Sequence, residues 1–316
     1  MSVNVARTVG GWWVESNGRL TRVATSAGTT RELLADRAAV EAAASTPDPD
    51  GPSADAEVLL SPVTTPARVV AQMVNYRSHA QDSGFDPDRV PAAFFRKASG
   101  SVSAPGEDIV RPGHVGFLDY EVELGLVFAR RLEIGTVIEP GDPALLARYV
   151  AGLVVTNDVS ARDVQLTKTQ FYEAKSYPTF TPVGPYLTLV DADDLAALDE
   201  VRLTLSVNGA TRQDSTLADM LVKPAAALTA LARFQTMEAG DLLLTGTPGG
   251  TALKSPPPLV TRLAGLLSPA RRLELFFKRQ ATNPNYLQDG DVVSASITLP
   301  GRGLDLGRQT NVVRAK

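Results

Sequence analysis

The amino-acid sequence predicts an α+β fold that is rich in β-strand. Apolar residues recur at every second position in several segments, which is the side-chain period of a strand. Long helices do not alternate regularly with these segments, and this argues against a doubly wound parallel sheet. The chain has 316 residues, of which 44% are hydrophobic and 21% charged, so it has enough apolar material for one large domain or two smaller ones.

The composition also excludes several classes of function. The formal net charge is −4 and there is no long basic stripe, which argues against a nucleic-acid partner. No apolar run reaches membrane-spanning length, and the first residues lack the apolar core of a signal peptide. Cysteine is absent, which excludes disulfides, a thiol nucleophile and a cysteine-type zinc site. We therefore expect a cytoplasmic protein without a nucleic-acid or membrane partner.

The first 60 residues are expected to form a small α/β unit. Residues 10–25 predict short strands, because Gly10-Gly11 and Asn17-Gly18 are turn signals. Thr29 and Glu32 have the spacing of a capping box, which predicts a helix from there to about Ala44. Residues 45–57 are rich in Pro, Asp, Gly and Ser and predict a linker. The main domain would then cover residues 61–316.

Further elements of the main domain follow from local patterns. The alternation in 201–207, followed by Asn208-Gly209, predicts a hairpin. A helix is expected over 228–237, a short buried strand over 241–247 and another strand over 292–299.

An acidic strand raises the question of function. In LDYEVELGLVF (118–128) alternate residues are apolar, and Asp119, Glu121 and Glu123 share the opposite face. These carboxylates either form a solvated outer face or supply oxygen ligands to a hard divalent cation. The motif alone favours the solvated face, because outer strand faces often carry charge.

A second acidic position strengthens the metal hypothesis. The apolar run that begins at Tyr149 stops at Asn157-Asp158, and Ser160 with Asp163 has capping-box spacing, which predicts a helix start. Asp158 would thus lie at a strand-to-helix corner, where ligands commonly bind. Two glutamates and this aspartate would suit Mg²⁺ or Mn²⁺. The alternative is that Asp158 only shapes the turn.

Two more side chains are candidates for catalysis. His79 precedes Asp82 by three residues, so in a helix the two could pair and the carboxylate could orient the imidazole as a general base. Lys175 could balance buried carboxylates or polarise a carbonyl. The alternatives are a structural histidine and a surface lysine. The turn in LLLTGTPGG (242–250) would let the backbone approach a ligand closely, although it could equally be an ordinary tight turn.

Together these segments resemble the fumarylacetoacetate hydrolase family. The resemblance runs from about Pro66 to Thr298 and rests on six stretches in one order: NYRSHAQDSG, LDYEVELGLVF, NDVSARDVQ, AKSYPTFTPVGP, LLLTGTPGG and LQDGDVV. It implies a β-rich roll around a divalent cation, Mg²⁺ or Mn²⁺ and sometimes Ca²⁺, and reverses the preference for a solvated face. The implied metal ligands are Glu121, Glu123 and Asp158.

The resemblance also implies roles for the remaining candidates. His79 would be the general base on a segment that closes over the substrate, with Asp82 where relatives often have glutamate. Lys175 would lie near the metal. Gln165 and Thr247 would contact the substrate, and Arg77 could bind its carboxylate. Family members are commonly homodimers.

One segment departs from the family pattern. Many relatives pass quickly from the TGTP turn to the GDVV segment, whereas here residues 255–286 intervene, much of them basic and predicted to be helical. This insertion could cap the site, reshape the pocket, join a dimer contact or form only a surface excursion.

The implied activity is hydrolysis of a carbon–carbon bond in a small 1,3-dicarbonyl 2-oxo acid of the acylpyruvate or fumarylacetoacetate type. A divalent cation would act as a Lewis acid, and His79 would activate water. The alternative is a decarboxylase or isomerase of 2-oxo or 3-oxo acids that uses the same ligands. A third hypothesis is a catalytically inactive scaffold, against which the complete set of site residues argues.

Overall fold

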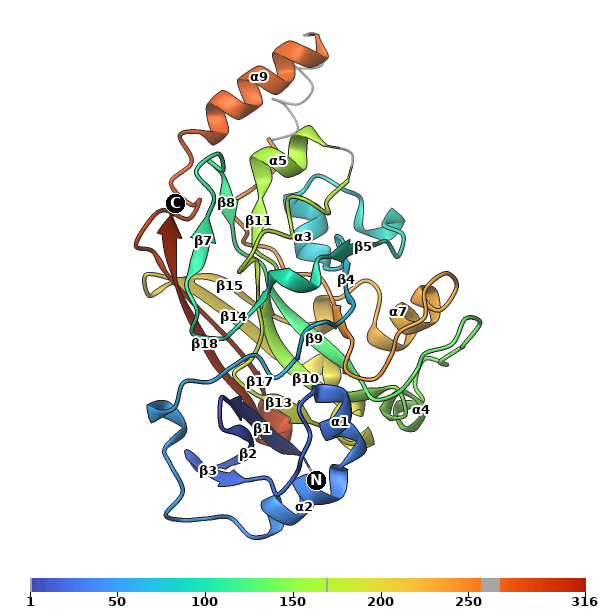
Figure 1. Cartoon of the computed structure of the whole chain (residues 1–316). Helices are drawn as coiled ribbons and strands as arrows, with labels where there is room; N and C mark the ends of the chain where they lie inside the picture. Colours follow the sequence, from blue (N-terminus) through green and yellow to red (C-terminus); the bar gives the residue numbers. More distant parts are fainter. Residues whose placement is uncertain (1, 169, 257–267) are drawn as a thin grey trace.

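The predicted α+β class is confirmed by a computed structural model, which describes residues 2–168, 170–256 and 268–316. Two large β-sheets form the body of the molecule, and short helices lie around them (Figure 1). The N-terminal strands and helices lie at one end and helix α9 (Pro269–Gln280) at the opposite end.

The larger sheet carries the acidic strand near its centre. Strands β9 (Val122–Phe128) and β10 (Val150–Asn157) are buried along their whole length, so each is covered on both faces. They pair antiparallel, with Thr156 opposite Glu123. Within the described residues the sheet has nine strands, in the order β3 (Arg19–Arg22), β2 (Gly11–Ser16), β1 (Val3–Thr8), β13 (Leu187–Leu189), β10 (Val150–Asn157), β9 (Val122–Phe128), β16 (Leu242–Leu244), β4 (Val69–Gln72) and β5 (Phe94–Lys97).

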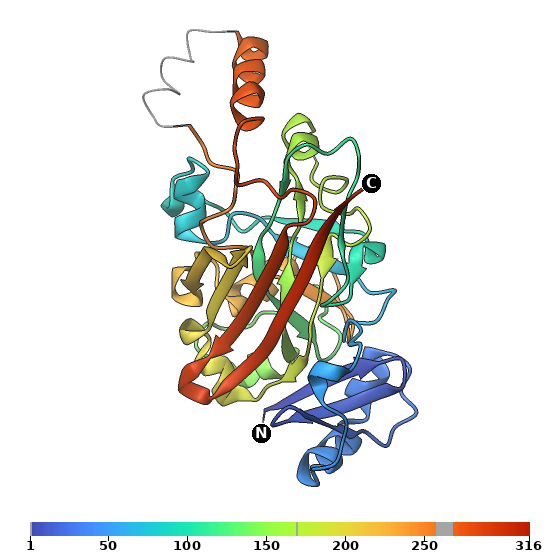
Figure 2. The ribbon, with the colours of Figure 1, turned by 90° about the vertical axis from the view of Figure 1, so that its left-hand side faces the viewer.

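The second sheet packs against the first and closes the core. Strands β14 (Arg202–Val207) and β17 (Val292–Leu299) alternate buried and more exposed residues, as the sequence predicts for 201–207 and 292–299. Buried side chains from β9, β10, β14 and β17 form the main core between the sheets, and Figure 2 shows the long β17–β18 pair crossing the body. The described strands of this sheet are, in order, β15 (Ala210–Thr216), β14 (Arg202–Val207), β17 (Val292–Leu299), β18 (Leu304–Ala315) and β7 (Ile109–Arg111).

The N-terminal segment extends the larger sheet. Strand β1 pairs antiparallel with β13, with Val5 opposite Leu187. The predicted capping box is confirmed, because the Thr29 side chain accepts from the Glu32 N–H and the Glu32 side chain accepts from the Thr29 N–H. The single helix predicted after it is instead two helices, α1 (Thr30–Ala35) and α2 (Arg37–Ser45), separated at Asp36. The predicted domain boundary near residue 60 stays a prediction.

Several predicted boundaries need correction. The helix expected over 228–237 is α7 (Pro224–Leu231), since proline suits a first helical turn. Its predicted last residue, Met237, instead forms a β-bridge with Leu132. The strand expected over 241–247 is shorter, because only β16 forms a strand there. The remaining described helices and short strands are α3 (Arg77–Asp82), α4 (Pro143–Ala147), α5 (Arg162–Thr167), α6 (Ala192–Ala196), β6 (Val102–Ser103), β8 (Leu118–Asp119), β11 (Ser160–Ala161) and β12 (Thr181–Pro182).

The insertion at 255–286 is partly described. Residues 257–267 lie outside the described residues, so the predicted role of that part is untested. The following residues form α9, which confirms the predicted helical character and carries Arg271, Arg272, Lys278 and Arg279. Helix α9 projects from the body (Figure 2). No helix among the described residues is long and apolar enough to cross a membrane.

Candidate metal and substrate site

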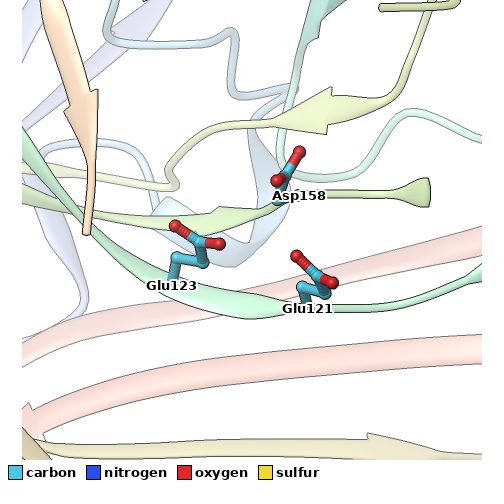
Figure 3. Close-up of side chains that lie close together, drawn as sticks. All are labelled: Glu121, Glu123 and Asp158. Carbon is cyan, nitrogen blue, oxygen red and sulfur yellow. The ribbon is translucent and has the colours of Figure 1, made fainter. Parts of the chain in front are cut away.

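Three carboxylates meet at the point where β9 begins and β10 ends. Oxygen atoms of Glu121, Glu123 and Asp158 all lie within 4.8 Å of one another, and Figure 3 shows the side chains gathered around one space. The backbone fixes this arrangement, because Asp158 N–H donates to the Glu121 carbonyl at 2.8 Å and Glu121 N–H donates to Asn157 Oδ1 at 2.9 Å. All three side chains are buried, so this is no solvated strand face.

Buried cations surround the three carboxylates. Lys175 Nζ lies 2.6 Å from Glu121 Oε2 and 2.7 Å from Asp158 Oδ2. Lys97 pairs with Asp158, and Arg162 pairs with Glu121. Because a carboxylate offers about four lone-pair positions, these contacts leave lone pairs for a metal ion. Lys175 therefore lies beside the predicted ligands, as the family resemblance implies.

Asp119, the third acid of the predicted face, belongs to a neighbouring arrangement. The chain leaves regular strand structure between β8 and β9, so Asp119 does not continue the alternation of Glu121 and Glu123. Its carboxylate lies 2.8 Å from Arg162 Nε and accepts hydrogen bonds from the N–H groups of Ala252 and Leu253. Asp119 thus anchors Arg162 and the chain after the 242–250 turn.

The net charge of this buried cluster is negative and favours binding of a divalent cation. Among the described residues, four buried carboxylates (Asp119, Glu121, Glu123 and Asp158) face three buried cations (Lys97, Arg162 and Lys175). One negative charge is therefore uncompensated in the buried cluster. A divalent cation would turn the balance to one positive charge, which suits an anionic substrate.

The pKa values of Glu121 and Glu123 are shifted in opposite directions. Burial raises the pKa of Glu121, but the charges of Lys175 and Arg162 outweigh burial and hold it below its usual range. Burial, together with the charges of Asp158 and Glu121, raises the pKa of Glu123 well above its usual range. The Glu123 carboxylate accepts a hydrogen bond from the Gly246 N–H at 2.6 Å. A cation would favour the ionised form of Glu123, so the residues fit a hard metal ion.

His79 lies in α3 and lines the same cavity as the glutamates. Burial lowers the pKa of His79 and, with the positive charges of Arg162 and Lys175, outweighs the opposing charge of Glu121. The imidazole is therefore held neutral near pH 7, as a general base requires. Its buried Nδ1 has no hydrogen-bond partner among the described residues.

The predicted pairing of His79 with Asp82 is wrong in this structure. Asp82 Oδ2 accepts from Gly250 N–H at 3.1 Å and lies 3.3 Å from Lys254 Nζ. Asp82 therefore connects α3 to the loop after β16. The helical spacing of the two residues was correct, but a tertiary contact takes the carboxylate.

Two loops hold α3 against the acidic cluster. Val74, between β4 and α3, has φ +53°, which is rare for a β-branched residue. Gly246, after β16, has φ +86°, and a Cβ there would lie 2.7 Å from Asn75 Cβ. The Asn75 amide donates to the Thr245 carbonyl at 2.7 Å. The backbone of this turn thus closely approaches Asn75 and Glu123, and the predicted approach to a ligand stays a prediction.

A cavity of about 280 Å³ opens onto the site. Of the predicted substrate-binding residues, Gln165 and Thr247 line the cavity, and so does Lys175. Gln165 Oε1 accepts from Arg162 at 2.8 Å, and Thr247 Oγ1 donates to the Val122 carbonyl at 2.9 Å. Arg77 does not line it, and its guanidinium pairs with Asp88 on the surface at 3.1 Å. A substrate role for Arg77 stays a prediction.

The helix start beside Asp158 also differs from expectation. Ser160 pairs with Asp119 in the β11–β8 ladder, and its hydroxyl donates to the Asp158 carbonyl at 2.8 Å. Helix α5 follows without a side-chain cap. Arg162 thereby becomes the first residue of α5 and points its guanidinium to the acidic cluster.

Sequence reasoning did not single out three residues of the site. Lys97 and Arg162 supply two of its buried cations, and Gln72 lines the cavity with a buried Oε1 that has no partner among the described residues. Arg162 lies in NDVSARDVQ, so that stretch carried a signal for it. Lys97 and Gln72 end strands β5 and β4, and their positions depend on sheet pairing.

Comparison with known protein families gives evidence that is independent of the site geometry. The model described as "Fumarylacetoacetate (FAA) hydrolase C-terminal" matches residues 68–314. This chain belongs to the fumarylacetoacetate hydrolase family. The family model therefore covers the acidic cluster, α3, the cavity and both large sheets except for the N-terminal strands.

Relatives in the family carry different reaction names. The mitochondrial oxaloacetate tautomerase FAHD2A of Bos taurus is 34% identical over 202 residues, which span 63% of this chain and 62% of that protein. The structure of a probable 2-hydroxyhepta-2,4-diene-1,7-dioate isomerase from Mycobacterium abscessus is 26% identical with a TM-score of 0.74, covering 100% of this chain and 99% of that one.

A third relative is a hydrolase by name. Fumarylacetoacetate hydrolase from Exiguobacterium antarcticum is 27% identical with a TM-score of 0.69, and the match covers 100% of both chains. The β-rich family fold expected from the sequence is confirmed by these structures. Members of this family thus act as tautomerases, isomerases and hydrolases.

Proposed function

We propose that this protein is a divalent-metal-dependent enzyme that moves a proton on a 2-oxo acid, as a tautomerase or isomerase. The observation that carries the proposal is that one cavity holds both an undercompensated acidic cluster and a buried imidazole without a partner at Nδ1 among the described residues. The tautomerase and isomerase names of two relatives support the reaction class.

Glu121, Glu123 and Asp158 would hold the metal, for which we propose Mg²⁺ or Mn²⁺, with Ca²⁺ as a further candidate. When bound, the cation supplies Lewis-acid polarisation to oxygens of the 2-oxo acid.

His79 removes the proton from the carbon beside the carbonyl and returns it at a different position of the substrate. Lys175 and Arg162 supply positive charge near the enolate that forms on the substrate. Gln165 and Thr247 line the cavity and would orient the substrate.

Hydrolysis of a carbon–carbon bond in an acylpyruvate is the second candidate. It would use the same ligands, with His79 taking a proton from water, and the hydrolase from Exiguobacterium antarcticum supports it. Hydrolysis benefits from a carboxylate that orients the imidazole, and this candidate is weaker because Asp82 contacts Gly250 and Lys254 instead. Decarboxylation would need the same groups and is distinguished by its carbon dioxide product.

The experiment is a product assay on chelator-stripped protein, with and without Mg²⁺ or Mn²⁺. A 2-oxo acid that tautomerises with unchanged mass, only when metal is present, would support the first candidate. Release of pyruvate and a second acid from an acylpyruvate would favour hydrolysis. Failure to bind any divalent ion at millimolar concentration would overturn both and would favour the inactive scaffold. A homodimer and a cytoplasmic location stay predictions.

A further inference from the structure

We infer that the substrate of this cavity is a 2-oxo acid whose far substituent is apolar, such as an aryl group, and not a second carboxylate. The inference rests on the proposed function and names the substrate class for the same site. It distinguishes this chain from its relatives, because oxaloacetate and a heptadiene-1,7-dioate are both dicarboxylates.

Aromatic and aliphatic side chains form much of the cavity wall. Their surface begins beside the charged cluster, where Lys175 Nζ lies 5.6 Å from the ring centre of Phe95. The ring of Phe171 meets Phe95 edge-on, with 5.6 Å between centres. Apolar side chains that line the cavity include Met73, Phe85, Phe95, Phe171, Leu253 and Phe276.

The cations that line the cavity already have anionic partners. Arg162 contacts Asp119 and Glu121, Lys175 contacts Glu121 and Asp158, and Lys254 lies 3.3 Å from Asp82. Among the described lining residues, no cation is left over for a second carboxylate of the substrate. Such a carboxylate would have to take Lys254 from Asp82 or be bound by uncharged side chains such as Ser83 and Ser255, which hold a carboxylate less strongly than a cation does.

Phe85 offers apolar surface that a substituent would cover. It lines the cavity although 54% of its surface is exposed. Covering exposed apolar surface is favourable in proportion to its area, and a carboxylate would cover less of this surface than an aryl group. An aryl or branched alkyl group therefore suits this side of the cavity.

Two matched substrates test the inference. Oxaloacetate and phenylpyruvate share the reacting 2-oxo acid and differ in a carboxylate against a phenyl group. With Mn²⁺-loaded protein and tautomerisation followed by ultraviolet absorbance, we expect kcat/KM to be about tenfold or more higher for phenylpyruvate. A higher value for oxaloacetate would overturn the inference. Fumarylpyruvate and benzoylpyruvate form the equivalent pair for hydrolysis.

Two variants test whether the apolar cavity wall causes the expected preference for phenylpyruvate. Phe85→Ala should raise KM for phenylpyruvate about threefold to tenfold and leave KM for oxaloacetate unchanged. Phe234→Ala is the matched control, because Phe234 is 62% exposed and lies outside the cavity lining. Equal changes for both substrates in the Phe85 variant would overturn the assignment.

Lys254→Met tests the alternative that Lys254 binds a second carboxylate of the substrate. We expect kcat/KM for oxaloacetate to change less than about twofold, because Lys254 already has Asp82 as its partner. A loss of about tenfold or more would identify Lys254 as a carboxylate-binding residue and overturn the inference. If the folded protein binds Mn²⁺ but turns over neither member of either pair, the proposed function fails as well. Turnover that favours the dicarboxylates would leave the proposed function intact.

Discussion

Lys175 Nζ bridges two carboxylates of the candidate metal site, at 2.6 Å from Glu121 and 2.7 Å from Asp158. The bridge is almost completely buried, so its ammonium supports the site electrostatically whether or not a metal ion is bound. It also explains how a cluster with four acidic groups can fold before a cation arrives.

Replacing this ammonium should make the fold depend on metal. We expect Lys175→Met to lose about 3–5 kcal/mol of stability without metal, because a buried ion pair loses one partner. Adding Mn²⁺ should restore part of that loss, since the cation replaces the missing charge. Thermal melts with and without Mn²⁺ measure this, with Lys254→Met at the exposed pair as control. An unchanged melting temperature without metal would contradict the bridging role.

Removing the candidate base should separate catalysis from metal binding. His79→Ala should lower kcat by roughly 100-fold or more, while Mn²⁺ affinity stays close to that of the unmodified protein. Steady-state kinetics and calorimetric titration measure the two effects. The chain has two histidines, and His114→Ala is the control because His114 contacts Tyr177 and lies outside the cavity lining. Normal turnover of the His79 variant would refute the assignment.

The pH dependence should report the environment of His79. Burial lowers its pKa, so the neutral base persists to a pH below the ordinary imidazole value of about 6.5. A bound cation would lower it further. The acidic limb of kcat/KM should therefore fall below about pH 6.5, with activity lost as His79 gains a proton. A limb centred above that ordinary value, measured in buffers of constant ionic strength, would be inconsistent with this environment.

Gly246 should be intolerant of any side chain. Alanine there would have φ near +86° and a Cβ 2.7 Å from Asn75 Cβ. We expect Gly246→Ala to destabilise the fold by about 1–3 kcal/mol and to weaken metal binding, because Gly246 N–H holds Glu123. Gly209→Ala is a matched control, since Gly209 has φ +78° but a Cβ added there would meet no atom within 4 Å. Urea titration of both variants should give a clearly larger loss at Gly246.

Gln72 should contribute to substrate binding at a cost in stability. Its buried amide oxygen lacks a partner among the described residues. Gln72→Leu removes that unpaired group, so we expect equal or higher stability together with a KM raised by about tenfold. Thermal melts and steady-state kinetics are sufficient. A loss of stability without any change in KM would assign Gln72 to the fold alone.

Local patterns located the three carboxylates of the cluster, whereas their role as metal ligands was implied by the family resemblance and stays a proposal. The period of a strand placed Glu121 and Glu123 on one face, and the end of an apolar run located Asp158. The ion pairs could not be found this way, since Lys97 and Asp158 are 61 residues apart and meet only through sheet pairing. The same limit explains Asp82: its helical spacing to His79 was visible, whereas its hydrogen bond to Gly250 arises from tertiary packing.

The pairing of β1 with β13 has a consequence for how copies of this protein could associate. It moves the outer boundary of the larger sheet from β13 to β3, a strand with exposed arginines at both ends. Residues 51–54 hydrogen-bond alongside, through Leu20 N–H to the Pro52 carbonyl and Ala54 N–H to the Gly18 carbonyl. Charge and this covering segment discourage addition of a foreign strand. The N-terminal strands therefore give the larger sheet a protected edge. A second copy of the protein is not expected to pair a strand with β3 on this side of the molecule.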